Sequence, residues 1–252
     1  MKFLVLLAIT CLTLATAPAA EKKPILLVLT NHGTLGASGQ PTGFFLSEAA
    51  HPWKVFVAAG HDVRLASPLG GFAPVDPKSL DLHDPANAVF WKKFGTEKAG
   101  TPGVADTLAL AGARPGDYAG IFFAGGHGTM WDFADSESLP KLTAAIYEQG
   151  GAVGAVCHGP AALVNVRLAN GQPLVAGRKV AAFTNAEEEA VKLANVVPFL
   201  LETKLTEAGA TVVTADNFTE NAVRDVRLVT GQNPASAQKA ATLLIEAING
   251  GD

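Results

Sequence analysis

Cysteine is nearly absent from this sequence of 252 residues, which contains two, Cys11 and Cys157. Cys11 falls in an N-terminal apolar run that we expect to be cleaved off, so Cys157 would be left without a partner in the chain. A fold held together by disulfides is therefore excluded. A lone thiol in an exported protein is either buried and inert or chemically reactive, and the rest of the sequence has to decide between these alternatives.

Basic charge is also in short supply. The 19 Lys and Arg residues are outnumbered by 23 Asp and Glu residues, which gives a net charge of −4. Nucleic-acid binding depends on a basic surface that neutralises phosphates, so we expect no nucleic-acid partner. Apolar residues make up 48% of the sequence, which is enough for the core of one large domain.

A run of apolar residues long enough to span a membrane is missing as well. The N-terminal run, residues 3–14, has the length of a signal peptide, follows a short basic start and precedes small residues at 15–20. We therefore expect residues 1–20 to be a signal peptide. The mature chain, 21–252, would then be exported to the periplasm or the medium, with no membrane contact after cleavage.

Apolar segments rich in β-branched residues alternate with segments of helical spacing. Ile25 to Thr30, for example, is a continuous apolar run of the kind found in strands buried on both faces. This alternation predicts an α/β fold with a doubly wound, mostly parallel sheet and helices on both faces. The expected strands are 25–30, 62–67, 118–124, 151–156, 179–184, 211–214 and 226–230, and the expected helices are 49–59 (with Pro52 in its first turn), 138–150, a helix after Pro160, and 234–248.

The segment from Gly70 to Gly116 interrupts the alternation. It is rich in proline and has the motif Trp-Lys-Lys-Phe at 91–94. We interpret it as a long, partly helical insertion that packs over one edge of the sheet. Such insertions often form a lid or a contact between subunits. The predicted organisation is thus one α/β domain with an inserted cap region at 70–116.

Polar clusters follow three of the predicted strands. They lie at 125–128, 157–160 and 185–189. Because ligands bind outside the carboxyl ends of the strands in an open parallel sheet, we expect these clusters to meet at one end of the sheet.

The cluster at Cys157 is the most informative. A strand runs directly into Cys157-His158, and a helix can begin at Pro160, as in a nucleophile elbow. The N-terminus of that helix would lower the pKa of the thiol from about 8.5, and His158 could pair with the sulfur. This pattern favours a reactive thiolate over an inert buried cysteine.

Several other residues are ambiguous when the local sequence is taken alone. Gly125-Gly126 suits an oxyanion hole but is equally typical of a plain strand-to-loop turn. His127 fits a loop histidine better than a catalyst. Glu48 is typical of a helix cap or dipole partner. Glu187, Glu188 and Glu189 are typical of a solvated helix start.

Together these segments resemble the ThiJ/PfpI superfamily, relatives of class I glutamine amidotransferases. The segments that carry the resemblance are AVCHGPA at 155–161 (the nucleophile elbow), AGGHG at 124–128 (the oxyanion-hole strand), 41–52 (the glutamate segment), 183–188 (the third triad member) and 230–236 (a late loop beside the active site). The resemblance covers nearly all of the mature chain. The long insertion points to the heat-shock chaperone and glyoxalase III branch.

The resemblance implies a flavodoxin-like fold and a specific set of site residues. It implies a catalytic triad of Cys157, His158 and Glu188, with Glu48 against the sulfur. The backbone N–H groups of Gly126 and His158 would form the oxyanion hole. Glu187 and Glu189 compete for the third place in the triad, and the spacing from the preceding Phe-Thr favours Glu188.

The implied activity is that of a glyoxalase III-like lyase, which converts methylglyoxal to D-lactate without glutathione, metal or other cofactor. It would act on small 2-oxoaldehydes and form a homodimer. Two alternatives stay open: a deglycase or peptidase that uses the same triad on glycated substrates or peptides, and an exported stress chaperone that binds unfolded proteins. Some members bind a metal through His and Glu residues, but that set cannot be placed here, so we expect none.

The implied chemistry suits these side chains. Cys157 would attack the aldehyde carbon and form a hemithioacetal. His158 or Glu48 would then move a proton from C1 to C2 through an enediolate, and hydrolysis of the resulting thioester would give the 2-hydroxy acid. Glu48 would need a raised pKa to donate a hydrogen bond to the sulfur.

Overall fold

The computed structural model describes residues 22–250. The predicted signal peptide, Cys11 included, lies outside the described residues. Within 22–250, no helix combines the length and the apolar character that crossing a bilayer requires.

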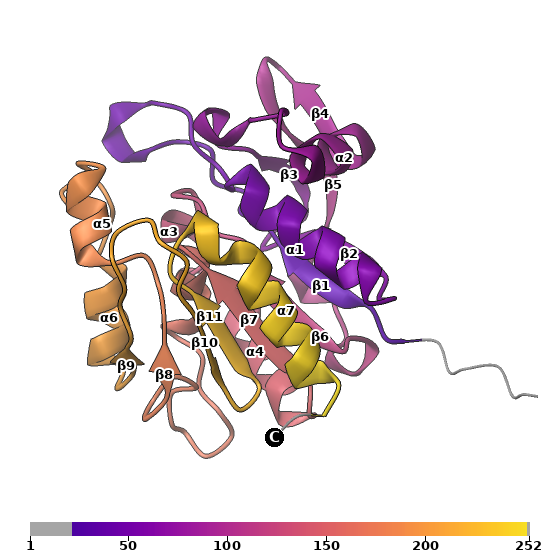
Figure 1. Cartoon of the computed structure of the whole chain (residues 1–252), viewed down its shortest axis with the longest axis vertical. Helices are drawn as coiled ribbons and strands as arrows, with labels where there is room; N and C mark the ends of the chain where they lie inside the picture. Colours follow the sequence, from indigo (N-terminus) through magenta and orange to yellow (C-terminus); the bar gives the residue numbers. More distant parts are fainter. Residues whose placement is uncertain (1–21, 251–252) are drawn as a thin grey trace, which may run out of the picture.

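The described chain is built on one nine-stranded sheet (Figure 1). Its order is β10 (Ala222–Asp225), β11 (Leu228–Gly231), β7 (Ala152–Val156), β6 (Gly120–Phe123), β1 (Ile25–Val28), β2 (Val63–Ser67), β5 (Thr101–Ala109) and β3 (Gly71–Pro74), with β4 (Gly95–Lys98) paired to β5. Neighbouring strands from β11 to β5 run parallel, whereas β10, β3 and β4 are antiparallel to their partners. The predicted α/β fold with a mostly parallel sheet is confirmed.

Helices cover both faces of the sheet (Figure 1). Because successive side chains of a strand point to opposite faces, β1 contributes to two separate cores. Ile25 and Leu27 pack with α1 (Leu46–Ala58) and α7 (Ala237–Ile248), while Leu26 and Val28 pack with α4 (Ser138–Glu148). Burial on both faces explains why β1 is uniformly apolar.

The predicted insertion contains more strand than expected. It forms β3, the 3-10 helix η2 (Pro77–Ser79), α2 (Pro85–Phe94), β4 and β5, followed by η3 (Leu110–Gly112) and η4 (Pro115–Asp117). Two residues at the end of β5 pair with β2, so the insertion extends the main sheet. Its helix α2 packs on α1, where the rings of Trp53 and Phe90 meet edge to face at 5.9 Å.

Two helix predictions need correction. Helix α1 begins at Leu46, so Pro52 lies inside the helix and not in its first turn. The reason is a distant cap, because the Ser79 hydroxyl accepts a hydrogen bond from the Leu46 N–H at 2.9 Å. The element after Cys157 is the short 3-10 helix η5 (Gly159–Leu163) and not an α-helix.

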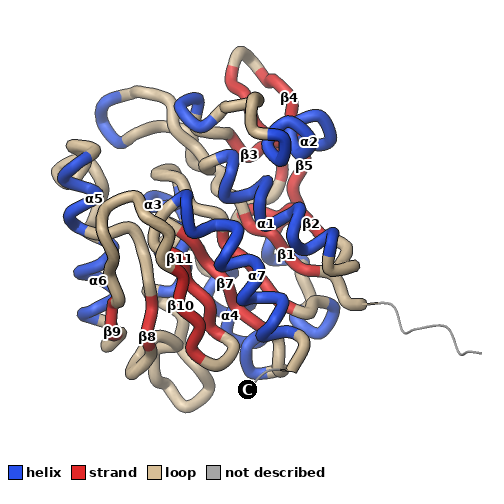
Figure 2. The backbone as a smooth tube through the Cα atoms, in the orientation of Figure 1, coloured by secondary structure: helices blue, strands red, loops and turns tan. Residues whose placement is uncertain are grey.

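The strand expected at 179–184 is also shorter and lies elsewhere. Only residues 179–180 form β8 (Lys179–Val180), which pairs with β9 (Thr211–Val212) in a two-stranded sheet beside the main one (Figure 2). The chain then turns back toward β7, and the Phe183 N–H donates to the Cys157 carbonyl at 2.9 Å. The remaining elements are η1 (Gly36–Ser38), α3 (Thr129–Asp132), α5 (Asn185–Ala190), α6 (Leu201–Glu207) and η6 (Pro234–Ser236).

Candidate active site

Cys157 occupies a strained turn between β7 and η5. Its φ of 60° is in the left-handed region, which non-glycine residues rarely adopt. The turn is held on both sides, because the Cys157 N–H donates to the Gly231 carbonyl at 2.9 Å and its carbonyl accepts from Phe183. At Gly159 a Cβ would overlap the Phe123 carbonyl oxygen, so the chain needs glycine there. This is the sharp bend that the sequence predicted.

His158 and Glu188 line up behind the thiol. The Cys157 Sγ is 3.3 Å from His158 Nδ1, and His158 Nε2 is 2.9 Å from Glu188 Oε2. All three side chains are buried, and Cys157 is 3% exposed at the floor of a cavity. The arrangement allows the imidazole to take a proton from sulfur while the carboxylate fixes the ring.

The local fold selects Glu188 from the three neighbouring glutamates. Thr184 caps α5, and its side chain and backbone form a capping box with Glu187. Glu187 is thereby held in structural hydrogen bonds, Glu189 is exposed, and Glu188 faces His158. Glu187 and Glu188 are buried, so the expectation of a solvated helix start is wrong for both.

Burial and pairing set the charges of His158 and Glu188. Burial lowers the pKa of His158 to about 4, and the charge of His127 acts in the same direction. Burial acts to raise the pKa of Glu188, but hydrogen bonds from His127 and His158 outweigh it and lower that pKa to about 2. Near neutral pH the site therefore holds a neutral imidazole, able to accept a proton, next to a carboxylate.

Glu48 reaches the same thiol from the first turn of α1. Its Oε2 accepts a hydrogen bond from the Gly125 N–H at 2.8 Å, and the carboxyl lies against Cys157. Glu48 therefore does not cap its own helix, which corrects the simplest sequence interpretation. Burial raises its pKa to about 8, against smaller opposing effects of Cys157 and Gly125, so the carboxyl carries a proton near neutral pH.

The pKa of the Cys157 thiol differs from the expectation based on the sequence. Burial raises the pKa of Cys157 well above its usual value, and the charge of Glu48 adds to this, while the backbone groups of His158 and Gly126 oppose it. The expected lowering of the pKa is wrong, because η5 is a single short turn and the sulfur is desolvated. The neutral His158 therefore has to remove the thiol proton as the sulfur reacts.

Gly126 supplies the backbone side of the site. Its φ is 102°, and a Cβ there would overlap the Gly43 carbonyl oxygen, so glycine is required. The backbone groups of Gly126 and His158 both reach the Cys157 sulfur. Two such N–H groups beside a nucleophile are placed to hold an oxyanion that forms on the attacked carbon.

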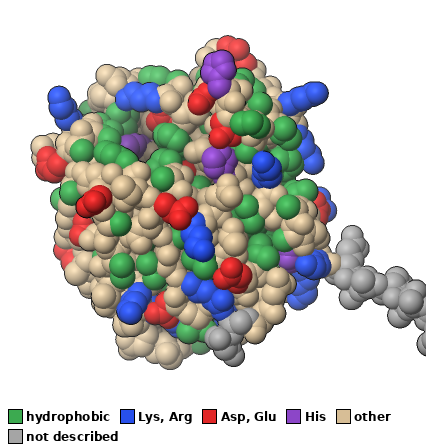
Figure 3. All heavy atoms as spheres, in the orientation of Figure 1, with side chains coloured by type: hydrophobic (Ala, Val, Ile, Leu, Met, Phe, Trp, Pro, Cys, Tyr) green, Lys and Arg blue, Asp and Glu red, His purple; other side chains and the backbone are tan. Residues whose placement is uncertain are grey.

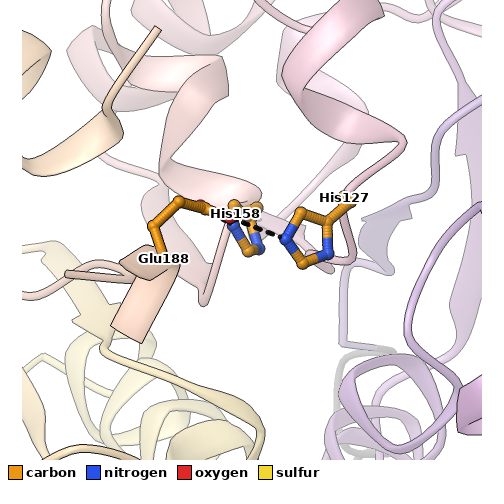
Figure 4. A group of neighbouring side chains, drawn as sticks. All are labelled: His127, His158 and Glu188. Atoms are coloured by element: carbon orange, nitrogen blue, oxygen red, sulfur yellow. Dashed lines mark hydrogen bonds and ion pairs between the residues drawn. The ribbon is translucent and has the colours of Figure 1, made fainter. Parts of the chain in front are cut away.

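His127 is the functional candidate that sequence reasoning missed. Its Nε2 is 3.0 Å from Glu188 Oε1, and its ring lies 4.1 Å from that of His158 (Figure 4). Glu188 thus bridges two imidazoles, and His127 also lines the cavity. The signal that could have found it is its position directly after a buried strand, in the segment that resembles the oxyanion-hole strand.

Within residues 22–250, His127, His158 and Glu188 form a group that could hold a metal ion. One ligand atom from each lies within 4.8 Å of the others. The same atoms already make hydrogen bonds of 2.9 and 3.0 Å with one another, so a cation would have to replace them. The expectation that no cofactor is needed stays a prediction.

The cavity above the sulfur has a volume of about 290 Å³. The loop after β1, the turn before η2, the segment after α5 and the loop around Phe218 form its walls. The lining residues are Leu35, Pro41, Phe45, Asp76, Lys78, Gly126, His127, Cys157, His158, Phe183, Val191, Leu193, Phe218 and Pro234.

Comparisons with known proteins agree on one family. Residues 41–247 match the model of the DJ-1/PfpI family. Glyoxalase 3 of Candida albicans is 33% identical over 88% of this chain and 97% of that protein. The glutathione-independent glyoxalase HSP31 of Saccharomyces cerevisiae is 31% identical over 90% of this chain and 98% of that protein. The X-ray structure of Rapid Encystment Protein 24 KDa of Francisella tularensis matches with a TM-score of 0.82 and 35% identity, over 90% of this chain and 99% of that one.

Proposed function

Because this chain belongs to the DJ-1/PfpI family, we propose that it is a glyoxalase III-type lyase. It would convert methylglyoxal and related 2-oxoaldehydes, with water, to D-lactate and other 2-hydroxy acids, using no cofactor. Two relatives that it matches over nearly their full lengths are named as glyoxalases, one of them glutathione-independent. The observation that carries the proposal is the Cys157 sulfur, 3.3 Å from the neutral His158 imidazole at the floor of a cavity.

The first step joins the substrate to Cys157. His158 Nδ1 takes the thiol proton as the sulfur attacks the aldehyde carbon, and Glu188 stabilises the imidazolium that forms. The N–H groups of Gly126 and His158 hold the new oxyanion. His158 returns the proton to this oxygen, which completes the hemithioacetal and restores the neutral imidazole.

The second step moves a hydrogen within the substrate. A base removes the proton from C1, and reprotonation at C2 converts the hemithioacetal into a 2-hydroxy thioester. We assign this transfer to Glu48 and His158, because both side chains contact the sulfur. The pKa of about 8 for Glu48 suits a group that gives and takes protons near neutral pH. Water then hydrolyses the thioester, which releases the 2-hydroxy acid and the free thiol.

A lactate assay with a cysteine variant tests the proposal. Purified wild-type chain with methylglyoxal should form D-lactate, and Cys157→Ser should lower kcat by at least about 10³-fold because alkoxide and thiolate differ in nucleophilicity. Absence of lactate with the wild-type chain, or full activity in Cys157→Ser, would refute the proposal.

Two other functions remain as alternatives, and their products and their dependence on Cys157 distinguish them from the first. A deglycase or peptidase would release product from glycated amino acids or dipeptides, and it would also lose activity in Cys157→Ser. A stress chaperone would suppress aggregation of an unfolded client equally well with and without that substitution. The exposed side chains of Val191 and Phe218 at the cavity mouth are the feature that favours the chaperone.

We further propose that the chain is exported and forms a homodimer. The support for export is the apolar N-terminal run followed by small residues. Fractionation of cells that make the full chain, with N-terminal sequencing of the product, should find a form that begins near Glu21 outside the cytoplasm. Light scattering of the purified chain tests the dimer.

A further inference from the structure

The cavity is larger than methylglyoxal requires. Methylglyoxal occupies roughly the volume of three water molecules, at about 30 Å³ each. The cavity measures about 290 Å³ and reaches from the sulfur to the surface. Bound at Cys157, methylglyoxal would leave most of this space filled with water.

The unused part of the cavity is apolar and aromatic. Beyond the two imidazoles, the ring of Phe183 lies 4.3 Å from that of His158, and the ring of Phe218 lies 6.2 Å from that of Phe183. Val191 and Leu193 add further apolar side chains to the lining. An apolar group placed there would displace water from hydrocarbon surface, which favours binding.

The cavity also has a polar lining at Asp76 and Lys78. Asp76 already accepts hydrogen bonds from the Thr42 hydroxyl and the Lys78 N–H, so its carboxylate is occupied. Lys78 is exposed at the rim, on the segment of η2. We expect the reacting end of a substrate to meet the polar groups at the sulfur, and its substituent to extend toward the rings of Phe183 and Phe218.

Phe218 is held in place at a conformational cost. Its φ of 60° is in the left-handed region, yet its side chain remains 49% exposed. The Phe218 N–H donates to Glu187 Oε1 at 2.8 Å, and Asn233 Nδ2 donates to the same oxygen at 2.9 Å. Because the ring of Phe218 is only half buried, its packing does little to offset the backbone strain. Contact with a bound apolar substituent would explain why the ring is held at the cavity mouth.

We propose that Phe183, Val191, Leu193 and Phe218 form a binding wall for 2-oxoaldehydes whose substituent is apolar and about the size of a phenyl ring. This inference rests on the proposed glyoxalase activity and names the substrates that this site prefers. The reaction is unchanged: the 2-oxoaldehyde takes up one water, C1 is oxidised to the carboxylate level, C2 is reduced to the alcohol, and no external oxidant or reductant is used.

Phenylglyoxal and methylglyoxal are the two probes that test the wall. The wild-type chain should convert phenylglyoxal to mandelate with a kcat/KM about ten-fold or more above that for methylglyoxal, because apolar substituents in a fitted pocket discriminate by this amount. Mandelate and lactate are each measured by chiral chromatography. A ratio of one or less would overturn the inference.

Substitutions at the wall test the residues. Phe218→Ala should lower the ratio of the two kcat/KM values by on the order of ten-fold, and Val191→Ala, a second and milder variant, by less. The matched control is Val226→Ala, since Val226 is also about half exposed (47%) and also has a positive φ (54°), but lies in the turn between β10 and β11. Its ratio should equal that of the wild type.

The outcomes separate this inference from the function on which it rests. If no lactate forms from methylglyoxal, the proposed function itself fails, and the inference that rests on it fails with it. If lactate forms while mandelate forms more slowly, or if Phe218→Ala leaves the ratio unchanged in a chain with native circular dichroism, the binding wall fails and the glyoxalase proposal stands.

Discussion

The carboxyl of Glu48 is the clearest case of a side chain whose protonation the fold controls. It is fully buried beside Cys157, and its pKa is raised from 4.5 to about 8. A carboxyl that is neutral near pH 7 can donate a proton or a hydrogen bond, which an ordinary glutamate cannot do. The part assigned to Glu48 in the proton transfer therefore depends on burial at this position.

Comparison of the wild-type chain with Glu48→Gln should reveal the raised pKa of Glu48 in the pH dependence of the free energy of unfolding. Below pH 4.5 the carboxyl is protonated in both states. Between pH 4.5 and about 8 the unfolded chain releases its proton while the folded chain keeps it, so the free energy of unfolding falls as pH rises. The loss is on the order of 4–5 kcal/mol across this window.

Urea denaturation at several pH values measures the effect. At each pH, the free energy of unfolding of Glu48→Gln is subtracted from that of the wild-type chain. The difference isolates the contribution of Glu48, because the other titrating groups are common to both chains. A difference that stays flat from pH 4.5 to 8 would show that the pKa of Glu48 is not raised. In kinetics, we expect Glu48→Gln to lower kcat by about 10²-fold or more, as for loss of a proton-transfer group.

His127 should influence the acid side of the pH–rate profile. The charge of His127 helps to lower the pKa of His158 to about 4. His158 has to be neutral to accept the thiol proton, so activity should fall as pH drops through about 4. In His127→Ala this acid limb should move to higher pH, and kcat should decrease. A profile of kcat/KM from pH 3 to 8 measures the shift; an unmoved acid limb would limit His127 to a structural role.

The sequence identified most of these residues but not their charges. Cys157 and His158 were predicted from the strand and the turn that carry them, and Glu188 was predicted from the family resemblance. The contact of His127 with Glu188 joins residues from distant segments, and the burial that sets the pKa of Glu48 comes from elements on every side. Such effects require the tertiary structure, so sequence reasoning underestimated His127 and expected too acidic a thiol.

At the scale of elements, the junction of β7 and η5 carries the nucleophile. Gly159→Ala would place a Cβ against the Phe123 carbonyl oxygen, and neither backbone segment can move without disturbing the sheet. We expect a loss of about 2–3 kcal/mol in the free energy of unfolding, typical of overpacking. That corresponds to a fall in Tm on the order of 5–10 °C for a domain of this size.

Gly112→Ala is the matched control for this junction. A Cβ at Gly112 meets nothing within 4 Å, and Gly112 also has an ordinary φ. Its Tm should stay within about 2 °C of the wild-type value. Equal melting temperatures for Gly159→Ala and Gly112→Ala would show that the turn is looser than the structure indicates.

Element boundaries were predictable where local sequence decides them. The buried strands β1, β6 and β7 are apolar throughout and were found close to their true limits. The start of α1 was not, because the cap at Leu46 comes from Ser79 in another segment. The run at 179–184 has the composition of a strand. However, the Ala181 N–H donates to the Thr230 hydroxyl and the Phe183 N–H donates to the Cys157 carbonyl, so these residues form no ladder with a neighbouring strand.

At the scale of the whole molecule, the insertion at 70–116 is part of the domain framework. Its strand β5 pairs with β2, and the Phe44 N–H donates to the Pro74 carbonyl at 2.9 Å. The sequence predicted a cap over one edge, because this segment is rich in proline and interrupts the alternation of strands and helices. The segment joins the main sheet because β5 pairs with β2. Local sequence patterns do not show this contact between distant segments.

Replacing residues 72–107 by a short Gly-Ser linker tests this integration. We expect a chain without cooperative thermal unfolding and without activity, because only the last two residues of β5 would remain beside β2 and α1 would lose its cap at Ser79. Circular dichroism melts and the lactate assay measure both. A shortened chain that still melts cooperatively would show that the segment is a removable cap.

One face of the molecule shows how the charges of the sequence are distributed. On the face shown in Figure 3, acidic and basic side chains are interspersed, and neither sign forms a continuous patch. A mixed surface of this kind offers little attraction to a polyanion.

The position of β1 in the sheet has a consequence for biosynthesis. This strand is apolar on both faces and pairs with β2 on one side and with β6 on the other. On the ribosome, β6 emerges only after the whole of the first half of the domain, so one edge of β1 has to wait for its neighbour. Until β6 is made, the nascent chain exposes an apolar strand with one unpaired edge. We therefore expect the yield of the protein in cells to depend on chaperones that bind nascent chains.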